Sequence, residues 1–353
     1  MDVRKTGQGF GTVSPETGKR GIPGSTIKII AVTAMLIDHV AAGLLARVLL
    51  QRGVLELGYV SERVRSAWMA ENGLLLYGME AMRAIGRLGF PIFCFLLVEG
   101  FQKTRNRRKY ALRLGLFALI SEVPFDLAFN GKVLELHYQN VYFTLLIGLL
   151  FMAVCACFAD VRLPGPARKV VVIAGTLVLS ACVAMNFRGV VLKRLLDREA
   201  EAGSLPAYFW LYRWTFYGLF LCGVLVMACA WPVCRRRFGD GAWRVYGNLA
   251  ALALAMCLAD FLRTDYSGMG VLTIAVMYFF RRNRMASMSA GCAVLTAMSL
   301  SELSAFFALI PIAKYNGARG LKMKYFFYAF YPVHLLLIWL VALAMGMGWM
   351  PTG

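Results

Sequence analysis

A lysine and a histidine in the first long apolar segment have spacing and chemistry suited to a reactive site. Lys28 lies eleven residues before His39. On an α-helix this spacing turns through roughly 1100°, about 20° from a whole number of turns, and rises about 16 Å. An imidazole can act as a general base or as a nucleophile, and an ammonium group can bind phosphate or amide oxygens. The sequence therefore predicts that Lys28 lies at one membrane rim and that His39 lies about halfway across, on the same helix face.

Asp38 is adjacent to His39 and is the second catalytic candidate. An acid at the centre of a membrane span costs about 2.5 to 3.5 kcal/mol on insertion scales, so its presence needs a reason. Neighbouring residues on a helix point about 100° apart, so the two side chains are not expected to hydrogen-bond to each other. Another helix must orient His39, and Glu99, Asp126 and Asp38 are the candidate carboxylates. A structural tie between helices is the alternative explanation for the Asp38–His39 pair.

Polar residues in other apolar segments extend the candidate site. The residues expected to bind substrate, together with Lys28, are Arg87, Glu99, Arg113, Asp126, Asn140, Tyr331 and His334. Unpaired charges are costly in lipid, so some of these must pair, and Glu99 and Arg113 near one rim are possible partners. In the aromatic segment near the C-terminus, an interfacial belt explains Lys324 and Tyr325 but leaves the deeper His334 unexplained.

Long apolar runs must position these residues. The chain has 353 residues, of which 59% are hydrophobic and 16% are charged, compared with about 45–50% and about 25% in soluble domains. Transmembrane strands would alternate with a short period, which these runs do not. The sequence predicts an all-α, polytopic transmembrane helix bundle of about ten helices, forming one domain over residues 25–350. The predicted spans are 27–50, 84–101, 110–129, 141–159, 170–192, 214–233, 245–262, 268–280, 286–312 and 325–347.

Two charged segments, 51–83 and 193–213, are expected to be loops with interfacial helices. The most basic loop, Gln102–Lys109, is expected to be cytoplasmic, as is a disordered tail over residues 1–24. Ten spans then place both termini inside a bacterial inner membrane. With ten spans, one basic loop would lie on the outer face of the membrane, although basic loops are expected on the cytoplasmic face. This loop carries Lys314, Arg319, Lys322 and Lys324. Either a span is miscounted, with 245–262 or 268–280 the candidates, or these cations serve a site.

Charge and cysteine content exclude other classes of protein. The formal charge is +19, but Lys and Arg lie mostly between the apolar runs, so no nucleic-acid partner is expected. The nine cysteines contain no CxxC pair and mostly lie inside apolar runs, where they act as small hydrophobic residues. No metal site and no disulfide framework is predicted.

Several segments resemble the TraX family, whose best-known member is associated with N-acetylation of conjugative pilin. The segments are Ile27–Ala41, Gly86–Leu114, Glu122–Leu150, Asp265–Leu272 and Asn316–Leu336. TraX-like proteins are similar to transmembrane acyltransferases in which a basic residue, ten further residues and a histidine on the first helix form the catalytic signature. Lys28 and His39 match that spacing.

The resemblance implies an enzyme that transfers an acyl group from cytoplasmic acyl-CoA, with acetyl-CoA as the expected donor. Lys28 would bind a CoA phosphate or pantetheine amide, and His39 would be the base or nucleophile. The acceptor would be an amine or hydroxyl of a protein N-terminus, a glycan or a lipid at or beyond the outer face. Membrane lipid is an expected partner, and an oligomer is compatible with the sequence.

A transporter or proton-coupled permease is the alternative from another class. In that case Asp38, His39, Glu122 and Asp126 would form a proton relay. No inverted repeat supports this, because the Asp-His-Val of the first helix has no counterpart halfway along the chain. A non-catalytic scaffold would leave the buried charges unexplained.

Overall fold

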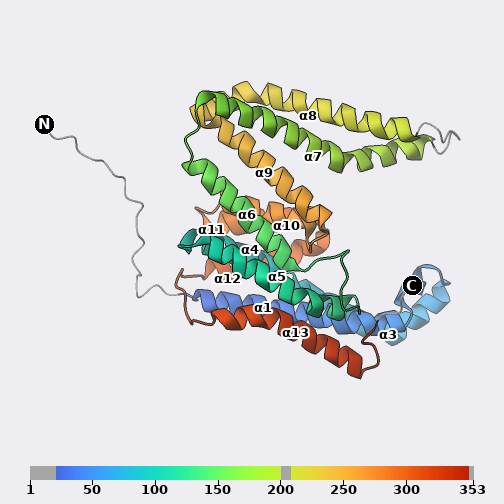
Figure 1. Ribbon diagram of the computed structural model, residues 1–353. Coiled ribbons are helices and arrows are strands. Elements are labelled where there is room, and N and C mark those ends of the chain that lie inside the picture. Colours follow the sequence, from blue (N-terminus) through green and yellow to red (C-terminus); the bar gives the residue numbers. More distant parts are fainter. Residues whose placement is uncertain (1–20, 200–207, 350–353) are drawn as a thin grey trace.

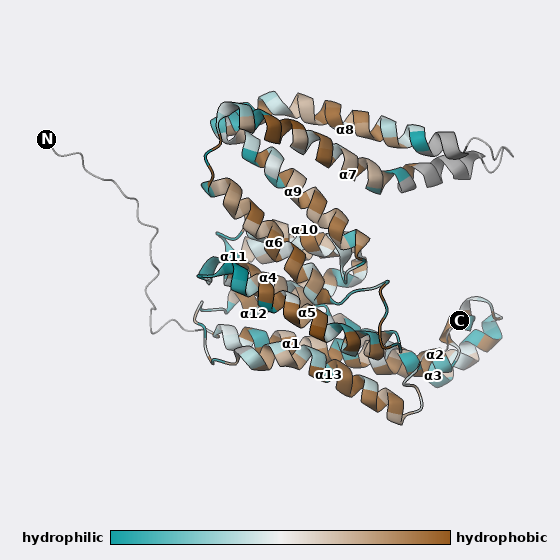
Figure 2. Ribbon diagram, in the orientation of Figure 1, coloured by the Kyte–Doolittle hydropathy of each residue, from teal (hydrophilic) through white to brown (hydrophobic). Residues whose placement is uncertain are grey.

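The computed structural model describes residues 21–199 and 208–349. These residues form helices, with two isolated β-bridges and no strand among them, so the predicted all-α class is confirmed (Figure 1). Six helical stretches of the described residues are long and apolar enough to cross a membrane, as the hydropathy colouring also indicates (Figure 2). They are Gly24–Gln51, Glu62–Lys103, Val141–Asp160, Gly165–Arg188, Arg213–Phe261 and Tyr325–Ala344. The predicted tail falls mostly in residues 1–20, outside the described residues.

The first apolar segment forms one long rod that carries both Lys28 and His39. It consists of α1 (Gly24–Val40), a π-helical turn (Ala41–Leu45) and α2 (Ala46–Gln51). The π turn starts two residues after His39, and such turns widen a helix locally and are frequent at functional sites. The rod therefore changes its helical register just beyond the candidate catalytic residue.

The charged segment 51–83, expected to be a loop with an interfacial helix, is mostly a 25-residue helix, α3 (Glu62–Gly86). Its charged and apolar residues give it an amphipathic pattern, and for this reason its sequence was not predicted to be a membrane span. The predicted second span begins a few residues later than expected, as α4 (Gly89–Lys103). Gly86 lies against the Asp38 side chain, so a Cβ at this position would clash with it. The end of α3 is thus packed directly against the middle of α1.

The body of the bundle surrounds α1 and α4. It contains α5 (Arg107–Phe129), α6 (Val141–Asp160), α10 (Ser267–Phe279), α11 (Arg284–Met298) and α13 (Lys324–Ala344). Its main core joins α4, α6, α10 and α11 through fully buried side chains such as Ile92, Met152 and Ile274. A smaller aromatic core, with Phe125, Tyr331 and Leu335, joins α5 to α13. Because α13 packs on both α5 and α1, the C-terminal aromatic segment lies beside the first helix.

The single span expected over 286–312 is wrong. The chain breaks at Ser299, which is extended, with φ −153° and ψ 134°, and whose Oγ accepts a hydrogen bond from the Ser301 amide. A 3-10 helix (Leu300–Ala308) and α12 (Leu309–Ala313) follow the break. They fold back along α11, since Cys292 Sγ lies 3.4 Å from the Ala305 carbonyl and Arg284 donates to the Tyr315 carbonyl. Residues 284–313 therefore form a hairpin that returns to the end where it began.

This hairpin corrects the position of the basic loop at 314–323. The Ile22 amide donates to the Lys314 carbonyl at 2.9 Å, and the Gly24 amide donates to the Ala318 carbonyl at 2.7 Å. The loop thus lies where α1 begins, not at the opposite end as the ten-span count required. The miscounted segment is 286–312, whereas 245–262 and 268–280 both form helices. We call this end, with loops 102–109 and 314–323, the basic end, and the opposite end the far end.

As a result, α13 runs parallel to α1. At the far end, the Arg47 guanidinium donates to the Met347 carbonyl and so joins α2 to the end of α13. The last described residues therefore lie at the opposite end from the start of α1, which does not fit an even number of crossings with both chain ends on one face. The final residues, 350–353, lie outside the described residues.

A long helical hairpin stands apart from this body. It consists of α7 (Gly165–Glu199) and α8 (Tyr208–Phe238), which lie side by side, and α9 (Ala242–Phe261) joins it to the rest (Figure 1). The predicted interfacial segment 193–213 is thus largely absorbed into α7 and α8, and residues 200–207 lie outside the described residues. The site described next is formed by the body.

Candidate active site

His39 is hydrogen-bonded to a second histidine on α13. His39 Nδ1 lies 2.7 Å from His334 Nε2, and the two rings are stacked with centroids 5.0 Å apart. His334 Nδ1 lies 2.7 Å from the carbonyl oxygen of Phe330, one helical turn earlier. A carbonyl oxygen can only accept a hydrogen bond, so His334 Nδ1 must carry the hydrogen. With both rings neutral, His334 Nε2 then accepts from His39 Nδ1–H.

This chain of hydrogen bonds leaves a free lone pair on His39 Nε2. That atom is the one that can accept a proton or attack a carbonyl. The group that orients His39 is thus a histidine and not one of the three carboxylates that the sequence offered. The edges of Phe129 and Tyr331 enclose the His39 ring, with centroids at 5.2 and 5.8 Å. His334 is only 4% exposed, whereas His39 is partly exposed.

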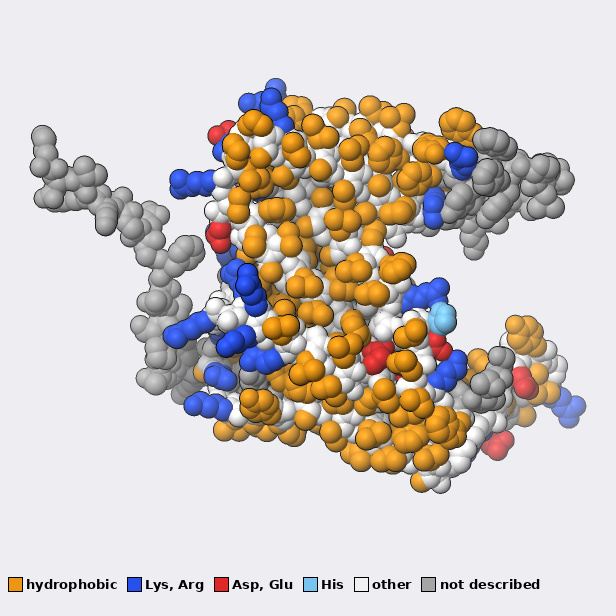
Figure 3. Space-filling view, in the orientation of Figure 1, with side chains coloured by type: hydrophobic (Ala, Val, Ile, Leu, Met, Phe, Trp, Pro, Cys, Tyr) orange, Lys and Arg blue, Asp and Glu red, His pale blue; other side chains and the backbone are white. Residues whose placement is uncertain are grey.

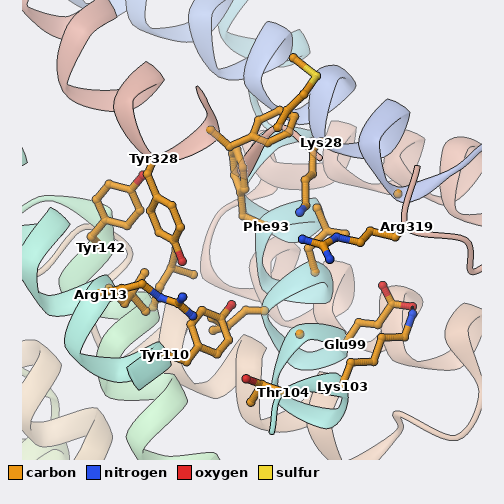
Figure 4. Close-up of a pocket in the computed structure, with 18 of the residues that line it drawn as sticks. Lys28, Phe93, Glu99, Lys103, Thr104, Tyr110, Arg113, Tyr142, Arg319 and Tyr328 are labelled. Atoms are coloured by element: carbon orange, nitrogen blue, oxygen red, sulfur yellow. Dashed lines mark hydrogen bonds and ion pairs between the residues drawn. The ribbon is translucent and has the colours of Figure 1, made fainter. Parts of the chain in front are cut away.

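A pocket of about 480 Å³ opens at the basic end. Its lining includes the basic side chains of Lys28, Lys103, Arg113 and Arg319 and one carboxylate, Glu99. Lys28 and Arg319 reach into the same space from one side and Arg113 from the other (Figure 4). Two lysines, two arginines and a single acid give this pocket a net positive charge, which favours an anion.

The charged residues of the pocket do not form the Glu99–Arg113 pair expected from the sequence. Glu99 accepts hydrogen bonds from Lys103, at 2.9 Å, and from the Tyr315 hydroxyl, at 2.7 Å, and not from Arg113. Arg113 lies beside Tyr110 and Tyr328 in the pocket wall (Figure 4). The Lys28 ammonium lies 5.5 Å from the centre of the Phe327 ring, a cation–π contact. Lys28 and Arg113 are therefore not bound by the pocket's only carboxylate.

An aromatic layer joins the pocket to the histidine pair. Tyr142 lines the pocket, and its ring centroid lies 4.9 Å from that of Tyr331. Tyr331 in turn meets the His39 ring edge-on. Along α1, Lys28 and His39 are separated by about 16 Å of helix. The packed rings of Tyr142 and Tyr331 thus lie between the basic pocket and the histidine pair.

Asp38 faces away from His39 and forms an ion pair with α3. Its Oδ2 lies 2.7 Å from Arg83, as expected if adjacent residues on α1 face different helices. One turn further, Arg87 pairs at 3.0 Å with Glu302 of the 284–313 hairpin, and Glu302 is only 2% exposed. These two pairs fasten α1, the end of α3 and the hairpin together. Arg87 therefore lies among structural charges and does not line the pocket.

Asp126 and Asn140 brace the connection between α5 and α6. Asp126 is fully buried and accepts from the Glu135 amide at 2.7 Å and from Asn130 at 3.0 Å. Asn140 caps α6 by accepting from the Tyr142 amide, and its own amide donates to Glu122 and to the Ala118 carbonyl. Neither residue lines the pocket, and both hold in place the start of α6, which carries Tyr142.

The connecting loop is also pinned to the turn between α9 and α10. The Tyr138 hydroxyl donates to Asp265 at 2.8 Å, and the Gln139 amide donates to the Arg263 carbonyl. Burial raises the pKa of the Asp265 carboxyl. Burial and the Asp265 carboxylate together raise the pKa of Tyr138. Hydrogen bonds from Lys132 and His137 lower the pKa of Glu135 to about 2, so this loop keeps an ionised acid close to its surface.

Sequence reasoning missed several residues that shape the site. The missed residues are Arg47, Arg83, Tyr110, Tyr142, Glu302 and Tyr328, whereas Arg319 was among the loop cations for which a site was one of the two explanations. Arg47, 4% exposed, donates to the carbonyls of Leu127 and Ala128 at 2.9 and 2.8 Å as well as to Met347, so it clamps the ends of α5 and α13 beside the histidine pair. A signal existed for Arg47 and Glu302, because each is a lone charge in an apolar run. The tyrosines gave none, since tyrosine is common at membrane interfaces.

The fold and the site define a polytopic helical membrane protein with a histidine pair beneath a basic pocket. The sequence model of the family described as "TraX protein" matches residues 23–203 and 204–342. The chain belongs to the TraX family. It is similar to the probable fimbrial assembly protein FimC, serogroup H1, of Dichelobacter nodosus, with 25% identity over 323 residues, which cover 88% of this chain and 92% of that protein. No solved structure matches the chain.

Proposed function

We propose that this protein is an integral-membrane acyltransferase that uses cytoplasmic acyl-CoA, with acetyl-CoA as the expected donor. The observation that carries the proposal is the hydrogen-bonded chain from the Phe330 carbonyl through His334 to His39. This chain leaves the Nε2 lone pair of His39 available to a reactant. A purely structural role would not require this nitrogen to be free, and Lys28 of the same helix lines the basic pocket.

The basic pocket is the proposed binding site for the acyl donor. CoA carries several phosphate charges, and the pocket provides Lys28, Arg113 and Arg319 for them. Its volume of about 480 Å³ lies within the usual range of small-molecule sites. The basic loops around its mouth favour a cytoplasmic position for this end, in the inner membrane of a bacterium. The pantetheine arm would run past Tyr142 and Tyr331 and bring the thioester to His39.

His39 Nε2 would take part in the transfer in one of two ways. As a base, it removes the proton from the acceptor N–H or O–H while that atom attacks the thioester carbonyl. The C–S bond then breaks, and the CoA thiolate receives the proton from the imidazolium. As a nucleophile, Nε2 forms an acyl-imidazole and releases CoA before the acceptor attacks. In both routes His39 Nδ1–H stays hydrogen-bonded to His334, which disperses the positive charge that develops on His39.

The acceptor would approach from the far end, which faces the outer side of the membrane in this orientation. The name of the D. nodosus relative makes the amine of a fimbrial subunit one candidate acceptor. A glycan and a lipid are the others, because each offers a hydroxyl group. Membrane lipid surrounds the protein in every case, and an oligomer would leave the path through one bundle intact.

Transfer from labelled acetyl-CoA tests the proposal. The purified protein in nanodiscs, given a membrane and envelope extract as the source of acceptors, should release free CoA and label an acceptor. His39→Ala should abolish both, whereas His137→Ala, at a side chain that is 77% exposed, should leave both unchanged. CoA-independent solute flux in liposomes without acyl transfer would contradict the proposal and favour a permease. The alternative proton relay has little support, because Asp38 pairs with Arg83, Asp126 accepts from Asn130, and Glu122 accepts from Asn140.

A further inference from the structure

An apolar groove lies on the opposite side of α6 from the histidine pair, between α6 and the α7–α8 hairpin. Its volume is about 450 Å³, and α9 forms its floor. Leu150, Val154 and Phe158 of α6 form one wall, Ala174 and Val178 of α7 form the other, and Leu254 of α9 lies in the floor. Leu150, Val154 and Leu254 are 48%, 39% and 53% exposed. These side chains would be in contact with whatever fills the groove.

Two glycines explain why the groove has this form. A Cβ at Gly175 would lie 3.0 Å from the Tyr246 carbonyl oxygen, so glycine lets α7 rest directly on the α9 backbone. A Cβ at Gly247 would lie 2.8 Å from the Phe158 ring, so glycine lets α6 approach the same helix closely. Helices α6 and α7 thus both pack on α9 and diverge away from it, which leaves a V-shaped channel between them.

The length of the groove matches one leaflet of a bilayer. On α6 its lining extends from Ile147 to Phe158, and on α9 from Gly247 to Leu258. Each range covers eleven residue steps, or about 16 Å at 1.5 Å per residue. Half of a hydrocarbon core that is about 30 Å thick is about 15 Å. The groove is therefore as long as one acyl chain in the leaflet at the basic end.

The charges at the mouth of the groove fit an anionic head group. At the basic end, Arg244 lies on α9 just before Gly247 and donates to the Val161 carbonyl at 3.3 Å. Arg168 lies on α7 just before the first lining residue, Val171. Its Nε donates to the Leu163 carbonyl at 2.8 Å, and its guanidinium lies 3.4 Å from Asp240, which is 94% exposed. Lys and Arg gather along this edge of the molecule, and hydrophobic side chains cover the face beside it (Figure 3). Two arginines thus lie about one helical turn beyond the apolar channel at the basic end.

We propose that this groove binds an anionic phospholipid of the leaflet at the basic end. One acyl chain lies along α9 between α6 and α7, and the phosphate binds Arg168 and Arg244. The lipid fills the space between the hairpin and the body, whose main contacts among the described residues run through α9. A neutral lipid would satisfy the apolar channel but not the two arginines, so the site selects for charge at its mouth.

Native mass spectrometry of the full chain tests this proposal. The detergent-purified protein is mixed with equal amounts of dioleoylphosphatidylglycerol and dioleoylphosphatidylcholine, and retained lipid is counted. Ala174→Phe, an exposed position in the groove wall, should lower the retention of both lipids about tenfold, which corresponds to displacing roughly two acyl methylenes. The matched Ala228→Phe, on the exposed face of α8, should leave retention unchanged.

The head-group part is tested separately. Arg244→Gln should lower the preference for phosphatidylglycerol about fivefold, whereas Arg237→Gln, exposed at the same end, should not. The proposal is overturned if Ala174→Phe and Ala228→Phe retain equal amounts of lipid. It is also overturned if Arg244→Gln leaves the preference for phosphatidylglycerol intact. It is equally overturned if Ala174→Phe changes a dimer into a monomer without changing lipid retention, because a second copy of the chain would then be the occupant.

Discussion

His39 Nδ1 and His334 Nε2 lie 2.7 Å apart although 295 residues separate them in the chain. The Phe330 carbonyl fixes the hydrogen on the far side of His334, so the direction of the hydrogen bond between the two rings is determined. His334 acts in this way as a positioning residue for His39, much as the orienting partner of a metal-bound or catalytic histidine selects its tautomer.

Removal of this partner should lower turnover more than donor binding. We expect His334→Ala to reduce kcat for acyl transfer about 100-fold, since a free His39 ring can adopt the wrong tautomer and orientation. The KM for acetyl-CoA should change little, because the pocket does not include His334. His334→Gln should recover part of the activity, as its Oε1 can accept from His39 Nδ1–H. Steady-state kinetics of both variants check this. Equal losses in the two variants, matched by equal losses in thermal stability, would indicate a packing role only.

Donor binding should depend on the pocket cations. Lys28→Ala and Arg113→Met should each raise the Kd for acetyl-CoA about 10- to 100-fold, the usual effect of losing a hydrogen bond to a charged group. Isothermal titration calorimetry in detergent measures this, at two salt concentrations. Lys109→Ala, exposed at the same end, is the control and should change Kd only slightly. A Kd that stays constant in Lys28→Ala would remove the assigned role of this residue.

The ion pair between Arg87 and Glu302 should matter for stability. Glu302→Gln leaves the Arg87 charge without its carboxylate in a site where Glu302 is 2% and Arg87 is 20% exposed. Breaking such a pair from one side typically costs about 3 kcal/mol or more, so the Tm in detergent should fall clearly. The double variant Arg87→Met/Glu302→Met should recover much of this loss, since no buried charge remains. Glu56→Gln, on an exposed turn, should leave Tm unchanged. A double variant no more stable than Glu302→Gln would argue against the charge as the cause.

The 284–313 hairpin predicts a specific topology. Cysteines introduced at Lys322 and at Lys109 should be labelled by an impermeant maleimide from the same side of the membrane, because both loops lie at the basic end. A cysteine at Val133, in the loop at the far end, should be labelled from the other side. Right-side-out and inside-out vesicles, with the native cysteines blocked beforehand, provide the measurement. Labelling of positions 322 and 109 from opposite sides would mean that residues 286–312 cross the membrane after all.

The sequence by itself determined the features that arise from local order. Runs of apolar residues long enough for a bilayer specify helices, and all of the predicted spans are helical over most of their length. The periodicity of a helix placed Lys28 and His39 on one face and turned Asp38 away from His39, and the ion pair of Asp38 with Arg83 agrees with this. These results follow from spacing along one segment, which needs no knowledge of its neighbours.

Only the tertiary structure decided which polar groups meet. That His334 orients His39, that Glu99 binds Lys103 and Tyr315, and that Glu302 is the partner of Arg87 depend on which helices pack together. The break at Ser299 was invisible for a related reason. An apolar hairpin buried against α4 and α10 has the same composition as a single span, and only its packing distinguishes the two. Hydrophobic burial is non-directional and can be read from composition, whereas hydrogen bonds and ion pairs are directional and require both partners in place.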